Sequence, residues 1–148
     1  MKKVGIIAKH TIAQRKEFVF ELVEKLRELK QEIIFDEHTG PLFKRAGMER
    51  NKILQRADIV IVLGGDGTLL KTARAMPRRR QPLIAAVNMG TLGFLTEFTP
   101  ANITKNLDRV CGEKSICIDE RFLLRVTLYR NGKKHNTSLA LNEAVINQ

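Results

Sequence analysis

The sequence predicts an α/β fold, in which a parallel-sheet domain is followed by the start of a second, antiparallel β-rich domain. Short apolar runs alternate with helical segments over the first 112 residues. One of these runs, at residues 57–63, is rich in Ile and Val, as in strands that are buried on both faces. After residue 115 the pattern changes to alternating positions around an Asn-Gly pair, which indicates a hairpin.

The first part of the α/β domain has the pattern of strand, helix, strand. An apolar run predicts the first strand at residues 3–8, and another predicts the second strand at 32–35. Between them, apolar residues from Phe18 to Leu29 recur at intervals of three and four, which predicts a helix over 13–29. Glycines interrupt the following stretch, so that only a short helix at 48–55 is expected there.

The second part repeats the alternation. Pro77 disfavours helical geometry in Met76 and so predicts the end of one helix. Thr99 followed by Pro100 predicts the start of another, since a capping residue precedes a proline at the first helical position, and Gly112 predicts its end. The elements expected here are a strand at 58–63, a helix at 69–76, a strand at 82–87 and a helix at 100–111.

The last 36 residues predict β structure. We expect strands at 115–119, 122–130 and 134–146, with Asn131-Gly132 as the turn of a hairpin. A lone hairpin buries little and is only marginally stable. We therefore expect one complete domain at 1–112 and the first strands of a β-rich C-terminal domain, itself cut short, at 113–148.

Composition narrows the class of protein. The formal net charge is +10, but the basic residues are dispersed and are not interleaved with aromatic side chains, so we predict an anionic small molecule as partner and no nucleic acid. No apolar run approaches the roughly 18–20 residues that span a bilayer, and no membrane partner is expected. Cys111 and Cys117 are too few for a disulfide framework, and we expect two reduced thiols in a cytoplasmic protein.

The most informative segment is Gly64-Gly65-Asp66-Gly67-Thr68, between a buried strand and a helix. Glycines allow a close approach of the backbone, and the unpaired N–H groups of a helix start favour phosphate. A carboxylate is a poor ligand for phosphate. Asp66 is therefore expected to take part in chemistry or to hold a metal, although an Asp that stabilises the helix dipole remains an alternative.

Three segments together resemble the NAD kinase family. The glycine-aspartate turn at 64–68 is similar to the first motif of these enzymes, and residues 88–96, with their Leu-Gly-Phe-Leu sequence, are similar to the second. Leu141-Asn142-Glu143 resembles their Asn-Glu motif. The order and spacing fit over essentially the whole chain. A related turn occurs in diacylglycerol and sphingosine kinases, so the first motif alone is less specific.

The resemblance implies an activity and a fold. NAD kinases transfer the γ-phosphate of ATP, or in some bacteria of polyphosphate, to the 2′-hydroxyl of the adenosine ribose of NAD, with a divalent metal, usually Mg²⁺. It implies a Rossmann-like nucleotide-binding domain, a β-rich domain, NAD between them, and a homo-oligomer, often a dimer or tetramer, when full length. A glycine- and serine/threonine-rich motif of the family's C-terminal domain is absent here, so activity of this chain is left open.

The resemblance also assigns roles to individual residues. Asp66 matches the proposed general base, which accepts the proton of the attacking hydroxyl. The resemblance implies no metal ligand among the protein side chains. The other matched positions are expected to bind nucleotide, and they are Gly64, Gly65, Gly67, Lys71, Phe94, Asn142 and Glu143. Purely structural roles stay open for these residues: a tight turn for the glycines, a solvated lysine, a core phenylalanine, and a polar pair at a strand end.

Two other segments are weaker candidates. His10 follows the first strand, at an end where open α/β sheets bind ligands, but an ordinary solvent-facing histidine explains it as well. Residues 78–80 are three arginines that either contact ATP phosphates or form a solvated loop. Two other functions also remain: a lipid kinase, and a non-catalytic domain that binds NAD or ATP.

Overall fold

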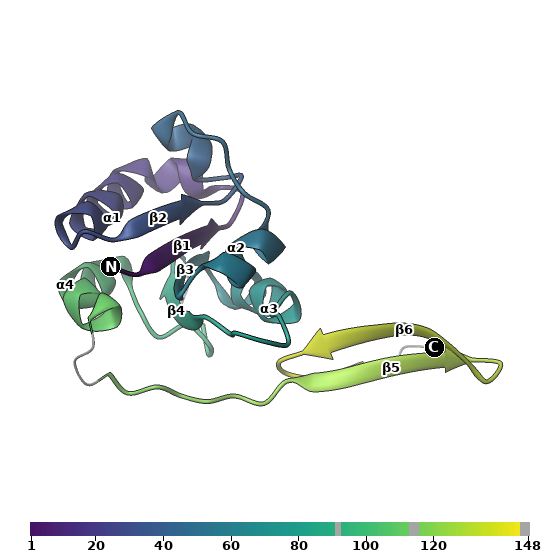
Figure 1. Ribbon diagram of the computed structural model, residues 1–148. Coiled ribbons are helices and arrows are strands. Elements are labelled where there is room, and N and C mark those ends of the chain that lie inside the picture. Colours follow the sequence, from purple (N-terminus) through teal and green to yellow (C-terminus); the bar gives the residue numbers. More distant parts are fainter. Residues whose placement is uncertain (91–92, 113–115, 146–148) are drawn as a thin grey trace.

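The computed structural model describes residues 1–90, 93–112 and 116–145 (Figure 1). Four parallel strands form one sheet in the order β2-β1-β3-β4, and two antiparallel strands form a separate sheet. The strands are β1 (Lys3–Ala8), β2 (Glu32–Phe35), β3 (Ile59–Gly64), β4 (Leu83–Asn88), β5 (Leu124–Arg130) and β6 (Lys133–Ala140). The α-helices are α1 (Lys16–Glu28), α2 (Arg50–Arg56), α3 (Asp66–Arg74) and α4 (Pro100–Cys111), with 3-10 turns at Ile12–Arg15 and Gly40–Phe43.

Helices cover both faces of the parallel sheet, which explains why its central strands are apolar throughout. On one face, α1 and α4 contact each other and pack on alternate residues of β1, such as Ile6. On the other face, α2 packs on Ile7 and Val62. Side chains of successive strand residues point to opposite faces, so each central strand contributes to both halves of the core.

The strand order creates a switch point between β1 and β3. The chain leaves β1 for β2 on one side and then returns to β3 on the other side of β1. Ala8 pairs with Leu63, and the N–H of Lys9 donates to the carbonyl of Leu63 at 3.0 Å. The ends of β1 and β3 therefore meet at one edge, where ligands bind in sheets of this type.

The two-stranded sheet is a hairpin that extends from the α/β body, and β6 contacts α3 (Figure 1). Asn131 and Gly132 have φ angles of 50° and 73°, the positive values that a two-residue type I′ turn requires. No helix in the described residues is long and apolar enough to cross a bilayer.

Most elements predicted from the sequence are confirmed, and some boundaries are corrected. The strands predicted at 3–8 and 32–35 have those bounds, and a 3-10 turn precedes α1 within the predicted helix. α3 begins at Asp66 rather than 69, because Gly65 is extended (φ −111°, ψ −168°) and acts as its N-cap; it ends at Arg74 rather than 76, because Ala75 leaves helical geometry.

Two predictions in the C-terminal region were wrong. Residues 116–119 of the predicted strand at 115–119 are not a strand, and residue 115 lies outside the described residues. The last strand stops at Ala140, whose partner Leu124 is the first residue of β5, and no described residue pairs with 141–145; residue 146 lies outside the described residues. The domain boundary after residue 112 stays a prediction.

Candidate functional site

The glycine-aspartate turn lies at the switch point of the sheet. β3 ends at Gly64, and α3 starts two residues later at Asp66. The first N–H groups of a helix have no partner within it and carry a partial positive charge. The turn therefore presents backbone donors at the edge where β1 and β3 meet, beside His10, which is exposed.

The carboxylate of Asp66 holds a second loop in position. Its Oδ2 accepts the backbone N–H of Phe94 at 2.9 Å, and its Oδ1 accepts that of Leu95 at 3.1 Å. The structure thus brings together the first and second sequence motifs, although residues 91 and 92 of the second lie outside the described residues. Asp66 does more than stabilise the dipole of its own helix.

Gly93 is a site residue that the sequence reasoning missed. A Cβ at this position would lie 2.3 Å from Oδ1 of Asp66 and 2.8 Å from its Cγ, which leaves no space for a side chain. A glycine inside the second motif was the available signal, but its partner is 27 residues earlier and could not be identified from spacing.

The three glycines of the first turn have different reasons to be glycine. A Cβ on Gly64 would lie 2.3 Å from Oγ1 and 2.5 Å from Cβ of Thr68, so this glycine permits α3 to fold back on β3. A Cβ on Gly65 or Gly67 would meet nothing within 4 Å. A tight connection therefore explains Gly64 but not the other two, whose open side can be approached by a ligand.

Asn88, at the end of β4, is a second residue that the sequence reasoning missed. It is buried, and its Oδ1 accepts the N–H of Gly90 at 2.9 Å. The next residue, Met89, donates its N–H to the carbonyl of Gly64 at 2.9 Å, which ties the start of the second motif to the first turn. A polar residue closing an apolar strand was the signal in the sequence.

Asp36, at the end of β2, is buried and fully used within the protein. Its Oδ2 accepts the N–H of Ala8 at 2.7 Å, and its Oδ1 accepts the N–H and the hydroxyl of Thr39 at 2.8 and 2.7 Å. Many dinucleotide-binding folds use an acidic residue near this strand end to bind ribose. Here that carboxylate braces the end of β1 instead.

Two predicted nucleotide-binding side chains are exposed next to the turn. Phe94 is 99% exposed although its backbone is fixed by Asp66, so it is not a core residue. Lys71 is exposed on α3, about one turn after Gly67. Both side chains are free to meet a ligand.

Asn142 and Glu143 are both exposed and follow the end of β6. Since β6 contacts α3, the structure brings this segment to the α3 side of the molecule. Within the described residues, no hydrogen bond or ion pair joins either side chain to the turn around Asp66.

The arginines at 78–80 lie away from the turn. Arg80 forms an ion pair of 2.5 Å with Asp58, which precedes β3 and so lies at the opposite edge of the sheet from Asp66. The backbone N–H of Lys3 is the main cause that lowers the pKa of Asp58 below its ordinary 3.8, and Arg80 lowers it further. This cluster stabilises the far edge of the sheet.

Comparisons with known proteins show which family this chain belongs to. The family model described as ATP-NAD kinase N-terminal domain matches residues 4–115. A protein named NAD kinase from Trichlorobacter lovleyi is 39% identical over 149 residues, which cover 100% of this chain and 52% of the relative. One of the same name from Solibacter usitatus is 39% identical over 99% of this chain and 50% of its own length. The chain thus spans about half the length of these relatives.

Two solved structures share the fold. The crystal structure of yeast NADH kinase complexed with NADH matches with a TM-score of 0.78 and 22% identity, over 96% of this chain and 47% of that one. An NAD kinase from Archaeoglobus fulgidus in complex with ATP matches with a TM-score of 0.56 and 18% identity, over 89% and 45%.

Proposed function

The chain belongs to the ATP-NAD kinase family, and from this premise we propose that it forms the first half of the catalytic site of an NAD kinase. The reaction would transfer the γ-phosphate of ATP to the 2′-hydroxyl of the adenosine ribose of NAD and give NADP. The observation that carries the proposal is the carboxylate of Asp66, held by two backbone N–H groups at the ligand-binding edge of the sheet. Family membership favours NAD over a lipid as the phosphate acceptor.

Asp66 is the proposed general base. A ribose hydroxyl is a weak nucleophile, and a carboxylate within hydrogen-bond reach would accept its proton as the oxygen attacks phosphorus. An ionised carboxylate has about four lone-pair sites, and the amides of Phe94 and Leu95 occupy two of them. The remaining sites can accept the hydroxyl, while the two amides fix the direction in which the carboxylate points.

The start of α3 is the proposed phosphate side of the site. Its first N–H groups and its dipole favour anionic groups, and the open sides of Gly65 and Gly67 let phosphate oxygens approach the backbone. Lys71, one turn further along, would add a positive charge. Among the described residues, no three His, Cys, Asp or Glu side chains are grouped to hold a metal. Mg²⁺ would arrive on the phosphates of ATP, as it commonly does.

The nicotinamide dinucleotide is proposed to bind beside Phe94. An exposed ring on a fixed backbone offers a flat apolar surface for an adenine. Asn142 would hydrogen-bond the base edge, and Glu143 would accept from ribose hydroxyls. The same proposal includes three further points: use of polyphosphate, a cytoplasmic location, and assembly of the full-length protein into dimers or tetramers.

A second candidate function is binding of NAD and ATP without turnover. The observation that favours it is that, within the described residues, no hydrogen bond or ion pair joins the side chain of Asn142 or Glu143 to the turn around Asp66. Groups that bind the two substrates without fixing them relative to each other would not orient them for reaction.

The test is NADP formation from NAD, ATP and Mg²⁺ by the chain and by Asp66→Asn, together with calorimetric binding of NAD and ATP. We expect turnover in the parent and a loss of about 10²–10⁴-fold in the variant, with ATP binding kept. Asp119→Asn is the matched control, because Asp119 is an exposed carboxylate paired with Arg121.

Each outcome separates the candidates. Equal turnover in Asp66→Asn and in the parent would contradict the role of Asp66. Binding of both nucleotides without NADP formation in any variant would support the non-catalytic function. Absence of both binding and turnover would overturn the proposal that this half carries the nucleotide site.

A further inference from the structure

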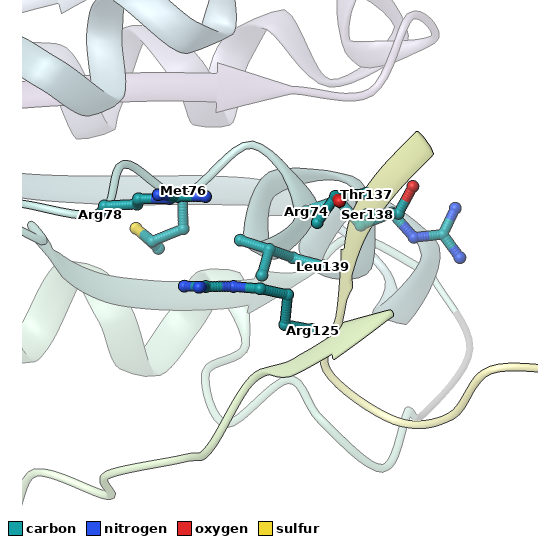
Figure 2. A pocket seen from close by; sticks show the side chains of 7 residues that line it. All are labelled: Arg74, Met76, Arg78, Arg125, Thr137, Ser138 and Leu139. Atoms are coloured by element: carbon teal, nitrogen blue, oxygen red, sulfur yellow. The ribbon is translucent and has the colours of Figure 1, made fainter. Parts of the chain in front are cut away.

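A cavity lies between the end of α3 and the hairpin (Figure 2). Its volume is about 380 Å³, within the range of small-molecule sites. Three separate segments contribute to it: the end of α3 with the residues after it, β5 and β6. The lining residues are Arg74, Met76, Arg78, Arg125, Thr137, Ser138 and Leu139.

The charge of this cavity is uncompensated. Three arginines line it, no carboxylate does, and none of the three forms an ion pair with a described residue. By contrast, the nearby Arg80 is paired with Asp58. The three arginines come from α3, from the segment after it and from β5. Like charges repel one another, so this arrangement is favourable when an anion lies between them.

The other lining groups suit an oxyanion. The hydroxyl of Thr137 lies on the same face of the hairpin as Arg125 and Leu139, 3.2 Å from the hydroxyl of Thr127. Met76 and Leu139 add apolar surface, which reduces competition from water for the charged contacts (Figure 2). Guanidinium groups bind phosphate oxygens in pairs of parallel hydrogen bonds, which gives the site a preference for phosphate over a simple ion such as chloride.

We propose that this cavity binds a compact, multiply charged phosphate compound of the pyrophosphate class. The site is separate from the proposed donor site, because the nine residues of α3 span about 13 Å between the turn at Asp66 and Arg74. An anion here would be held by α3 on one side and by the hairpin on the other.

The expected consequence is a tighter connection between the two parts of the protein. α3 begins at Asp66, and β6 leads directly to Asn142 and Glu143. A ligand that binds only when α3 and the hairpin are together stabilises that arrangement by mass action. Pyrophosphate would therefore hold the two sequence motifs in a fixed relation without touching either.

The test is calorimetric titration of the chain with sodium pyrophosphate, in the absence of nucleotides. We expect Arg78→Gln and Arg125→Gln each to weaken binding by about tenfold, the loss typical of one charge-assisted contact. Arg79→Gln is the matched control, because it removes the same charge from the adjacent, exposed residue that does not line the cavity. Asp66→Asn should bind pyrophosphate as the parent does.

NMR provides a second readout that locates the ligand. Pyrophosphate should shift the backbone amide signals of residues 137–139 more than those of 65–67. No binding, an equal loss in Arg79→Gln, or shifts centred on 65–67 would overturn the proposal. A failure of NADP formation would leave it untouched, since the titration contains neither substrate.

Discussion

The backbone N–H of Phe94 donates to Oδ2 of Asp66, and this bond of 2.9 Å joins two loops whose residues are 28 positions apart in the sequence. A neighbouring bond from Leu95 to Oδ1 doubles the connection. The proposed general base is therefore also the anchor of the loop that carries an exposed aromatic ring. A change at Asp66 affects chemistry and loop order together, and the two effects need separate measurements.

Asp66→Ala removes both acceptors of this connection. We expect the amides of Phe94 and Leu95 to exchange with solvent at least about tenfold faster. A hydrogen bond to a charged acceptor raises the free energy of local opening of the loop by enough to account for that factor. Hydrogen exchange followed by NMR measures it, with Asp119→Ala as control. Unchanged protection of the two amides would show that other contacts hold the loop.

The glycines of the first turn should separate folding from binding. Gly64→Ala forces a Cβ into Thr68 and is expected to lower the free energy of unfolding by about 1–3 kcal/mol. Gly67→Ala adds a methyl group in open space within a helix, where alanine is favourable by about 0.5–1 kcal/mol. Urea unfolding measures both changes.

The Gly67→Ala variant also gives an expectation for ATP binding. Gly67→Ala should fold well but bind ATP more weakly, because its methyl group occupies the side that phosphate approaches. If both variants have the parent's stability, the close contact between Gly64 and Thr68 does not constrain the turn.

The two cysteines should differ in reactivity. Burial raises the pKa of the Cys111 thiol to about 11, so almost none of the reactive thiolate is present at neutral pH. Cys117 is exposed. We expect iodoacetamide to modify Cys117 in the native chain and Cys111 only after unfolding, as read by peptide mass spectrometry. Modification of both at similar rates would contradict the packing of α4 on the sheet.

Asp58 should give a defined acid dependence of stability. Its pKa is lowered in the folded state, chiefly by the N–H of Lys3, so its contribution is present above the ordinary value of 3.8 and is lost as pH falls through the lowered value. The difference in unfolding free energy between the parent and Asp58→Asn should therefore be largest near neutral pH and shrink below pH 3.8.

Arg80→Gln is the companion variant for this measurement. It removes the ion pair but leaves the Lys3 bond, so part of the acid dependence should remain. Urea unfolding at several pH values distinguishes the two causes. A stability difference that does not change with pH would show that the lowered pKa is absent in solution.

The α/β architecture could be predicted because local and global signals agree. The apolar run of β3 fits a strand buried on both faces, and the glycine turn after it fits a strand-to-helix connection. The wrong predictions concern the strands of the C-terminal region, where a segment becomes a strand only if another segment pairs with it. Residues 116–119 have the composition of a strand, but a strand requires a partner, and they pair with none of the described residues, which no local pattern could reveal.

The candidate site was predicted in part. Asp66 and its glycines follow from residue type and position, whereas the dependence of Gly93 on Asp66 requires knowledge of how two distant loops meet. The internal use of Asp36 was equally hidden, since a buried and an exposed carboxylate at a strand end look alike in a sequence. The features of the site that could not be predicted are contacts between residues far apart in the sequence, because a local sequence pattern does not specify them.

The central position of β1 has a consequence for how the chain acquires its structure. β1 is synthesised before β2 and β3, yet one of its two edges stays unpaired until residues 59–64 have followed it. Closing this long loop is a slow event in folding, because the chain loses entropy before the pairing compensates for it. The edge that binds ligand is formed in the same event, so a nascent chain that stops before β3 is expected to have neither a finished sheet nor a site.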